Sequence, residues 1–467
     1  ARAGELGFEG ALTANAYLGA GGIATALSAG ADIVVTGRVT DASVVVGPGM
    51  WRFGWTTEDP AHLDVLAGAV VAGHVIECGT QATGGNFSGF LDLPRDTTPL
   101  GFPLAEIASD GSSVITKHAG TGGAVTIDTV TAQLLYEVQS TTYLNPDVSV
   151  DLSSIQLSDD GTDRVRVSGV RGGTRPERLK VCVNTLGGHR NQLELVFTGM
   201  DIDAKAAWVR AQLEAAWAAA GGAPAQVAWA WNRTSVPADA ASEEEASRIL
   251  RCTVLDPDAT KVGKAFTAPL VELALASYPG FTMTSPPGKP SPYGVYRPGY
   301  VDRAEVEQVV VHADGRREVV PEDPCNAGLL PVYKGPAGEM SDLTPGYMGV
   351  ASASTTRQPL GTVVHARSGD KGGDANVGLW VRQGPQREQR VAWLIDLITP
   401  ERVVELLPEA DGLEVEVYAL PNLGGVNVLI HGLLGEGVAA STRFDPQAKG
   451  LGEFFRSRPV DIPEELI

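Results

Sequence analysis

The order of apolar segments in residues 359–467 limits the possible folds more than any other feature of the sequence. Two β-branched runs come first, two amphipathic helical segments follow, and two more strands and a final helix complete the unit. We predict strands at 362–366, 376–381, 413–419 and 426–430, and helices at 391–398 and 400–407. Because a sheet with helices on one face satisfies this order, the unit is predicted to be a small α+β domain.

Residues 1–323 carry a different pattern, typical of an α/β domain. A predicted helix at 23–29 precedes the apolar run 31–36, in which Ile33 to Val35 has no polar member. Because strands of parallel sheets are covered on both faces, we predict a mostly parallel sheet with this run as an inner strand. Residues 324–358 lack periodicity and are predicted to be a linker.

Charge and cysteine content exclude several classes of function. The chain has 36 basic and 56 acidic residues, a net charge of −20, whereas nucleic-acid binders carry a basic face and anionic membranes attract basic segments. No apolar run is long enough to span a bilayer, and the four cysteines form no C-x-x-C pair. We therefore expect a cytoplasmic protein with no intrinsic metal or cofactor, acting on a small anionic molecule.

Residues 66–123 hold three polar clusters in an otherwise apolar stretch. Helix ends and glycine-rich turns with such side chains are where folds place their chemistry. In the second cluster, Thr83 and Asn86 are candidate substrate ligands. The clusters are AGHVIECG at 72–79, TQATGGN at 80–86 and ITKHAGTGG at 115–123.

The first cluster contains a candidate acid–base set at the end of a predicted helix, 63–78. His74, Glu77 and Cys78 lie at positions i, i+3 and i+4 and so share one face. The negative end of a helix keeps a carboxylate basic and disfavours a thiolate, so we rank Glu77 as a general base above Cys78 as a nucleophile. The alternative is a structural role, with the cysteine as a small hydrophobe and the histidine bonded to backbone.

The third cluster is a candidate anion site. Lys117 precedes Thr121, Gly122 and Gly123, and successive glycine amides form a nest for phosphate or carboxylate to which a lysine adds charge. A plain tight turn is the alternative interpretation.

Another candidate anion ligand follows the predicted inner strand. Arg38 and Asp41 lie at its carboxyl end, where open α/β sheets bind ligands. Arg38 suits a carboxylate or phosphate, and Asp41 is a further candidate acid–base group. A helix cap at Asp41 with Arg38 as its ion-pair partner is the alternative.

Residues 366–376 are too rich in charge for an ordinary hairpin tip. We interpret Arg367, Asp370, Lys371 and Asn376 as substrate ligands, together with His431 at a later strand end. A solvated turn is the alternative. We expect the C-terminal unit to pack on the main domain or on a neighbouring subunit, so that Arg367 comes near a cleft.

Several of these motifs resemble the acyclic terpene utilisation AtuA-type family. They are GADIVVTGRVTD at 30–41, AGHVIECG at 72–79, QATGG at 81–85, ITK-x-x-GTGG at 115–123 and VSG-x-R at 167–171. ARSGDKG at 366–372 and HGLLG at 431–435 resemble the ferredoxin-fold domain at the C-terminus of that family. His118 and Ala119 depart from the two prolines that many relatives have there.

The resemblance implies degradation of acyclic terpenoids such as citronellol and geraniol through acyl-CoA esters, with coenzyme A as part of the substrate. It carries no catalytic assignment. Relatives have a long α/β segment before the stretch that begins here at Asn15, so we expect that segment to be absent from this sequence or supplied by a partner chain.

The sequence therefore predicts an enzyme of acyl-CoA, branched-acid or terpenoid-acid catabolism that uses acid–base chemistry of a hydratase, lyase or hydrolase type. A homo-oligomer is expected. Two alternatives belong to other classes: a non-catalytic scaffold subunit of a carboxylase or pathway complex, and a tailoring enzyme of natural-product biosynthesis.

Overall fold

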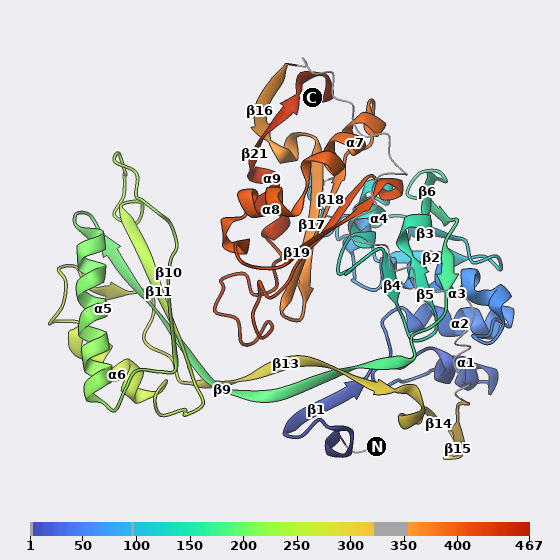
Figure 1. Ribbon diagram of the computed structural model, residues 1–467, viewed down its shortest axis with the longest axis horizontal. Helices are drawn as coiled ribbons and strands as arrows, with labels where there is room; N and C mark the ends of the chain where they lie inside the picture. Colours follow the sequence, from blue (N-terminus) through green and yellow to red (C-terminus); the bar gives the residue numbers. More distant parts are fainter. Residues whose placement is uncertain (1–2, 95–97, 322–353) are drawn as a thin grey trace.

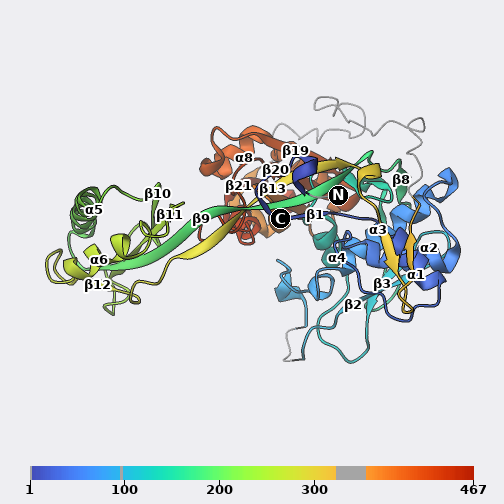
Figure 2. The ribbon, with the colours of Figure 1, turned by 90° about the horizontal axis from the view of Figure 1, so that it is seen from below.

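The computed structural model describes residues 3–94, 98–321 and 354–467. Figure 1 shows a core unit beside a C-terminal domain, with a long β ribbon running beneath both. The ribbon ends in a distal unit, and the view from below in Figure 2 shows how far this unit stands from the rest. Of the predicted linker, residues 324–353 lie outside the described residues.

The core unit combines four helices with two small sheets. Its helices are α1 (Gly21–Ser28), α2 (Ser43–Phe53), α3 (Leu63–Ile76) and α4 (Ile127–Leu134). One sheet has the order β2 (Pro103–Ile107), β3 (Ser113–Lys117), β7 (Val165–Ser168) and β6 (Gln156–Asp159). The other has the order β4 (Thr142–Leu144), β5 (Ser149–Asp151) and β8 (Arg171–Gly173).

The prediction of a mostly parallel sheet is wrong. Strand pairs in the described residues are antiparallel, apart from isolated parallel bridges at Leu18–Val39 and Leu100–Gly122. The predicted inner strand 31–36 is irregular, and Ile33 and Val35 are 83% and 91% exposed. An apolar run of this length does not reveal whether neighbouring strands exist to pair with it.

Helix α3 occupies the centre of the core unit, as its composition predicts. Every residue from 66 to 75 is buried. Its small residues allow close packing, since a Cβ at Gly68 would lie 2.1 Å from the carbonyl oxygen of Gly111. The helix ends close to the predicted residue, and Gly79 follows with a φ of 62°.

The ribbon is built on one strand, β9 (Arg178–Thr198), of 21 residues. It pairs antiparallel with β1 (Ala11–Ala16) and β13 (Ser291–Asp302) near the core, and with β11 (Ser247–Asp256) and β12 (Thr282–Met283) in the distal unit. The distal unit adds β10 (Gln226–Trp231), α5 (Ile202–Ala219) and α6 (Lys264–Leu273) around its own core of Phe197, Trp217 and Phe266.

Two further sheets have two strands each. One is a hairpin around Asp314-Gly315, formed by β14 (Val309–Val311) and β15 (Arg317–Val319), with Gly315 at a φ of 84°. Residues 354–358, placed in the predicted linker, instead belong mostly to β16 (Thr355–Pro359), which pairs with β21 (Pro459–Pro463).

The C-terminal domain has the predicted α+β order. Its antiparallel sheet runs β17 (Val364–Lys371), β18 (Asp374–Val381), β20 (Gly425–Ile430) and β19 (Val415–Leu420). The helices are α7 (Arg387–Leu397), α8 (Pro400–Leu406) and α9 (Leu451–Ser457). None of the helices in the described part of the chain is both long enough and apolar enough to cross a membrane.

The C-terminal domain packs on the core unit, which is one of the two arrangements that we expected. Trp380, Leu420 and Leu423 belong to the apolar cluster of the core unit rather than to that of their own domain. Gly378 of β18 lies directly against Leu135 at the end of α4: a Cβ there would be 2.5 Å from the Leu135 Cβ and 2.7 Å from its carbonyl oxygen.

We predict that Gly378→Ala loosens this interface. Because the clash is partly with backbone, a side-chain rotation cannot relieve it, and overpacking of this kind typically costs about 1–3 kcal/mol. Urea denaturation should show the loss. Gly37→Ala is the matched control, because a Cβ at Gly37 meets no described atom within 4 Å. Equal stability of the two variants would contradict the close packing.

Candidate functional site

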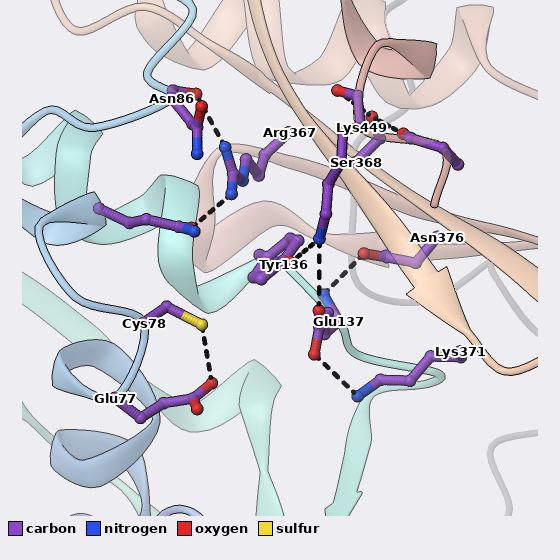
Figure 3. Close-up of polar contacts among 12 residues, drawn as sticks. Glu77, Cys78, Asn86, Tyr136, Glu137, Arg367, Ser368, Lys371, Asn376 and Lys449 are labelled. Atoms are coloured by element: carbon purple, nitrogen blue, oxygen red, sulfur yellow. Dashed lines mark hydrogen bonds and ion pairs between the residues drawn. The ribbon is translucent and has the colours of Figure 1, made fainter. Parts of the chain in front are cut away.

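Polar side chains from both domains meet where the core unit contacts the C-terminal domain (Figure 3). The end of α3 supplies Glu77 and Cys78, the segment after α4 supplies Tyr136 and Glu137, and the C-terminal domain supplies most of the cations. We call this group the interdomain cluster. Predicted site residues that it includes or directly adjoins are Glu77, Cys78, Asn86, Arg367, Asp370, Lys371 and Asn376.

Glu137 lies at the centre of the cluster in a backbone conformation that side chains rarely adopt. Its φ is 58°, in the left-handed region. Its carboxylate lies 3.6 Å from the Lys371 ammonium and 3.7 Å from that of Lys449. Burial alone would raise the pKa of Glu137, but Lys371, the Tyr136 hydroxyl and Lys449 together lower it. Glu137 is therefore held as an anion, in a strained conformation that often accompanies a functional site.

Two buried asparagines hold Glu137 in place. The Glu137 N–H donates to Asn376 Oδ1 at 2.8 Å, Asn376 Nδ2 donates to Asn427 Oδ1, and Asn427 Nδ2 donates to the carbonyl of Val138 at 3.2 Å. Both asparagines are fully buried. Asn376 thus positions Glu137 across the domain interface, which differs from the predicted role of a substrate ligand.

Arg367 is a buried cation that is only partly neutralised. Its guanidinium lies 4.4 Å from the centre of the Tyr136 ring and donates to the Asn86 carbonyl at 3.0 Å and to Gln81 Oε1. In the described residues no carboxylate lies within 4 Å of it, and its buried Nε has no hydrogen-bond partner. Burial lowers the pKa of Arg367. A buried guanidinium with acceptors but no counter-ion is suited to binding an anion.

Tyr136 connects Arg367 with Lys449. Its ring is buried between them, the Lys449 ammonium lies 4.7 Å from its centre, and Lys449 Nζ donates to the hydroxyl. Burial, followed by the neighbouring Glu137, raises the pKa of Tyr136. Its hydroxyl therefore stays protonated and is able to donate a hydrogen bond.

Glu77 and Cys78 face this set from the end of α3 (Figure 3). The Cys78 thiol donates to Glu77 Oε1 at 3.3 Å. Burial, helped by Glu77, raises the pKa of Cys78 to about 12, and burial also raises the pKa of Glu77. Within the residues described, no cation forms an ion pair with Glu77. A carboxylate with raised proton affinity suits a general base, and a protonated thiol is a poor nucleophile.

His74 and Thr83 lie in the interior rather than in the cluster. His74 Nε2 lies 2.9 Å from the Gln133 carbonyl, and burial lowers the pKa of His74 to about 4, so the ring is neutral. The Thr83 hydroxyl donates to the carbonyls of Thr80 and Gly101. Both side chains bond to backbone, which for His74 is the structural alternative that the sequence left open.

The predicted anion nest is a structural turn. Lys117 Nζ donates to the Thr121 carbonyl at 2.8 Å and forms an ion pair with Asp163 at 3.2 Å. The Gly122 amide donates to the carbonyl of Pro99. The glycines permit close approach of neighbouring chain, because a Cβ at Gly122 would lie 2.2 Å from the Thr98 carbonyl oxygen and one at Gly123 equally close to that of Thr83.

We therefore predict that Lys117→Met lowers stability without weakening ligand binding. The change leaves Asp163 without its cation and the Thr121 carbonyl without its donor, for which a loss of about 1–3 kcal/mol is expected. Urea unfolding measures it, with the exposed Lys264→Met as control. Weakened binding of an anionic ligand at unchanged stability would restore the nest hypothesis.

Three other predicted site residues are not part of the interdomain cluster: Arg38, Asp41 and His431. Arg38 and Asp41 are largely exposed and form the ion pair of the alternative interpretation, at 3.5 Å, but Asp41 does not cap a helix, because the N-cap of α2 is Ala42 and no side chain caps it. Asp41 still contributes to raising the pKa of Glu77, so it lies near the cluster. His431 contacts Glu416 at 2.9 Å and Asp374 at 3.3 Å; burial alone would lower its pKa, but these carboxylates raise it. It orders a turn of the C-terminal domain.

Sequence reasoning missed Gln81, Tyr136, Glu137 and Lys449 as site residues. Tyr136 and Glu137 follow an apolar helix, and no motif marks them. Gln81 and Lys449 lie in polar stretches that the sequence does display, but their partners are more than 200 residues away. Within residues 366–376, Gly369 reflects the close packing on Tyr136, because a Cβ at this position would lie 2.5 Å from the Tyr136 ring.

Three hollows lie in or near this part of the molecule. One of about 920 Å³ lies along residues 29–39 and 308–316, away from the Glu77 and Arg367 side chains. Two smaller ones, of about 380 and 330 Å³, adjoin the cluster at Lys371. Among residues 3–94, 98–321 and 354–467 no group of three or more His, Cys, Asp or Glu side chains is arranged to hold a metal ion.

Comparison with protein families agrees with the motifs. Residues 3–312 match the acyclic terpene utilisation family protein AtuA. The chain belongs to this family. Residues 358–461 match the AtuA ferredoxin-like domain, which identifies the C-terminal α+β domain of this AtuA-family protein. No match was found among curated proteins or among solved structures.

Proposed function

We propose that this AtuA-family protein is an enzyme of acyl-CoA or terpenoid-acid catabolism, acting on a carboxylate or thioester at the interdomain cluster. One observation carries the proposal: Arg367, a buried cation with no carboxylate partner in the described residues, lies in the same cluster as Glu77, a half-buried carboxylate with no cation partner there. An anion-binding group and an unneutralised base are the two parts that acid–base chemistry on an acyl group requires.

The roles follow from the donors and acceptors. Arg367 would bind the substrate carboxylate or the thioester oxygen, where its fork stabilises negative charge as it develops. Glu77 would take a proton from carbon or from water, and the Tyr136 hydroxyl would help to keep Glu137 ionised. Hydratase, lyase and hydrolase reactions all use this set, and coenzyme A would enter as part of the substrate.

The test is a calorimetric titration with a panel of acyl-CoA esters and free branched acids, followed by mass spectrometry of each bound compound after incubation. The proposal expects saturable binding of at least one compound and its conversion. Binding without any conversion, or no binding across the panel, would contradict it.

A scaffold function is the second candidate, and the distal unit is the feature that favours it. This unit has its own apolar core and is carried away from the interdomain cluster on a long ribbon (Figure 2). A scaffold would co-purify with partners in fixed ratio and would bind none of the acyl-CoA esters.

A further inference from the structure

A cleft beside the interdomain cluster carries a lysine that the proposed chemistry does not use. It lies between the ribbon and the C-terminal domain, where the two hollows of about 380 and 330 Å³ adjoin. Both are lined by Lys180 and Tyr296 of the ribbon and by Lys371 and Glu436 of the C-terminal domain. The cleft therefore shares Lys371 with the cluster, and Glu137 lines the larger hollow as well.

Lys180 is held in this cleft by aromatic rings. Its ammonium lies 5.9 Å from the centre of the Tyr17 ring and 6.0 Å from that of Tyr296. In the part of the chain that the structure describes, it has no carboxylate within ion-pair distance. Burial, and next the charge of Lys371, lowers the pKa of Lys180. Two ammonium groups thus repel each other across a partly desolvated space.

The acidic groups of the cleft are engaged with other partners. Glu436 pairs with Arg297 at 3.2 Å, and Glu137 lies between Lys371 and Lys449. Asp374 accepts from the Gly432 amide and contacts His431. Asp370 also lines the cleft, and burial followed by the charge of Glu137 raises its pKa, which weakens it as a counter-ion. Lys180 is left as the cation that these neighbours do not neutralise.

We propose that this cleft is a second anion-binding site, in which Lys180 and Lys371 hold a carboxylate or phosphate group. The inference rests on the proposed function: one ligand would reach from Arg367 to Lys180 and carry negative charge at both ends. The rings of Tyr17 and Tyr296 offer apolar walls to the chain that connects them. The substrate is thus either a dicarboxylate or an acyl group joined to a phosphorylated carrier.

Paired probes distinguish these sources by calorimetry on the full chain. 4′-Phosphopantetheine and pantetheine differ in one phosphate, and glutarate and butyrate differ in one carboxylate. In at least one pair, we expect the compound with the additional anionic group to bind at least tenfold more tightly than the compound that lacks it. Lys180→Gln should remove that difference, whereas Lys264→Gln, an equal change of charge on the exposed surface of α6, should alter affinity less than twofold.

Two results would overturn the second site: equal affinities within both pairs, or a preference that survives in Lys180→Gln. Circular dichroism establishes that the variant is folded, and Lys180→Arg, which keeps the charge, should retain the preference. The binding measurement requires no turnover, so a result that disproves the second site does not bear on proton transfer at Glu77. Conversely, an inactive protein that still shows the Lys180-dependent preference would disprove only the proposed reaction.

Discussion

Glu77→Gln is expected to reduce turnover by about 10²–10⁴-fold, the range for loss of a general base. The glutamine keeps the size of the side chain and an oxygen that accepts from the Cys78 thiol. It removes the group whose raised pKa enables it to take a proton. Steady-state kinetics on whichever panel compound is converted measures the loss, and the thermal midpoint establishes that the variant is folded.

The pH dependence provides a second measurement on the same group. A base works deprotonated, so the rate in the wild type should rise with pH through a value above the ordinary range of glutamate. This limb should disappear in Glu77→Gln and persist in Glu272→Gln, an exposed carboxylate of α6. A pH profile unchanged by Glu77→Gln would remove Glu77 from the mechanism.

Substitution of Cys78 tests whether Glu77 acts as a general base or Cys78 acts as a nucleophile. Because burial raises the pKa of the Cys78 thiol to about 12, the thiol is protonated at neutral pH, and Cys78→Ser should retain most of the activity. Rapid inactivation by iodoacetamide at neutral pH, mapped to Cys78 and prevented by substrate, would reverse the ranking. Covalent thioester chemistry would then be the better hypothesis.

Arg367→Gln is expected to weaken binding of the anionic ligand by roughly 10–100-fold, because a charge-assisted bond to a desolvated group is worth about 1.5–3 kcal/mol. Calorimetry with the tightest compound of the panel measures the change. Arg367→Lys keeps the charge but loses the forked pair of donors, so its affinity for the ligand should lie between those of the wild type and Arg367→Gln. Arg357→Gln, an exposed site paired with Asp461 at 3.6 Å, is the control for net charge.

The stability of the variant must be measured alongside, because Arg367 also bonds across the domain interface to Asn86 and Gln81. If Arg367→Gln unfolds the protein, Arg367→Lys remains the test, since a lysine satisfies one of these acceptors. Unchanged affinity in a folded Arg367→Lys together with a folded Arg367→Gln would show that Arg367 serves only to join the domains.

The C-terminal domain shows how much of this fold is encoded locally. Its strand and helix order is readable because its strands and helices are separate apolar segments, and short turns join β17 to β18 and β19 to β20. The end of α3 is equally local: an apolar run stops at Glu77, and Gly79 adopts the left-handed conformation that ends helices.

The run at 31–36 shows where local information ends. Its residues have strand propensity, but a strand exists only if a neighbour pairs with it, and neighbours come from elsewhere in the chain. The same holds for Lys117, whose charge suggested a ligand site and whose partner, Asp163, lies on a distant turn.

By itself the sequence determined the family, the α+β domain at the C-terminus and the polar segments in which the cluster residues lie. Only the tertiary structure decided which of these residues face one another. Glu137 meets Lys371 and Lys449, and Arg367 meets Tyr136, because the C-terminal domain packs on α4 with a glycine at the contact. Charges bind and perturb each other over a few ångströms of space, and separation along the chain does not encode that distance.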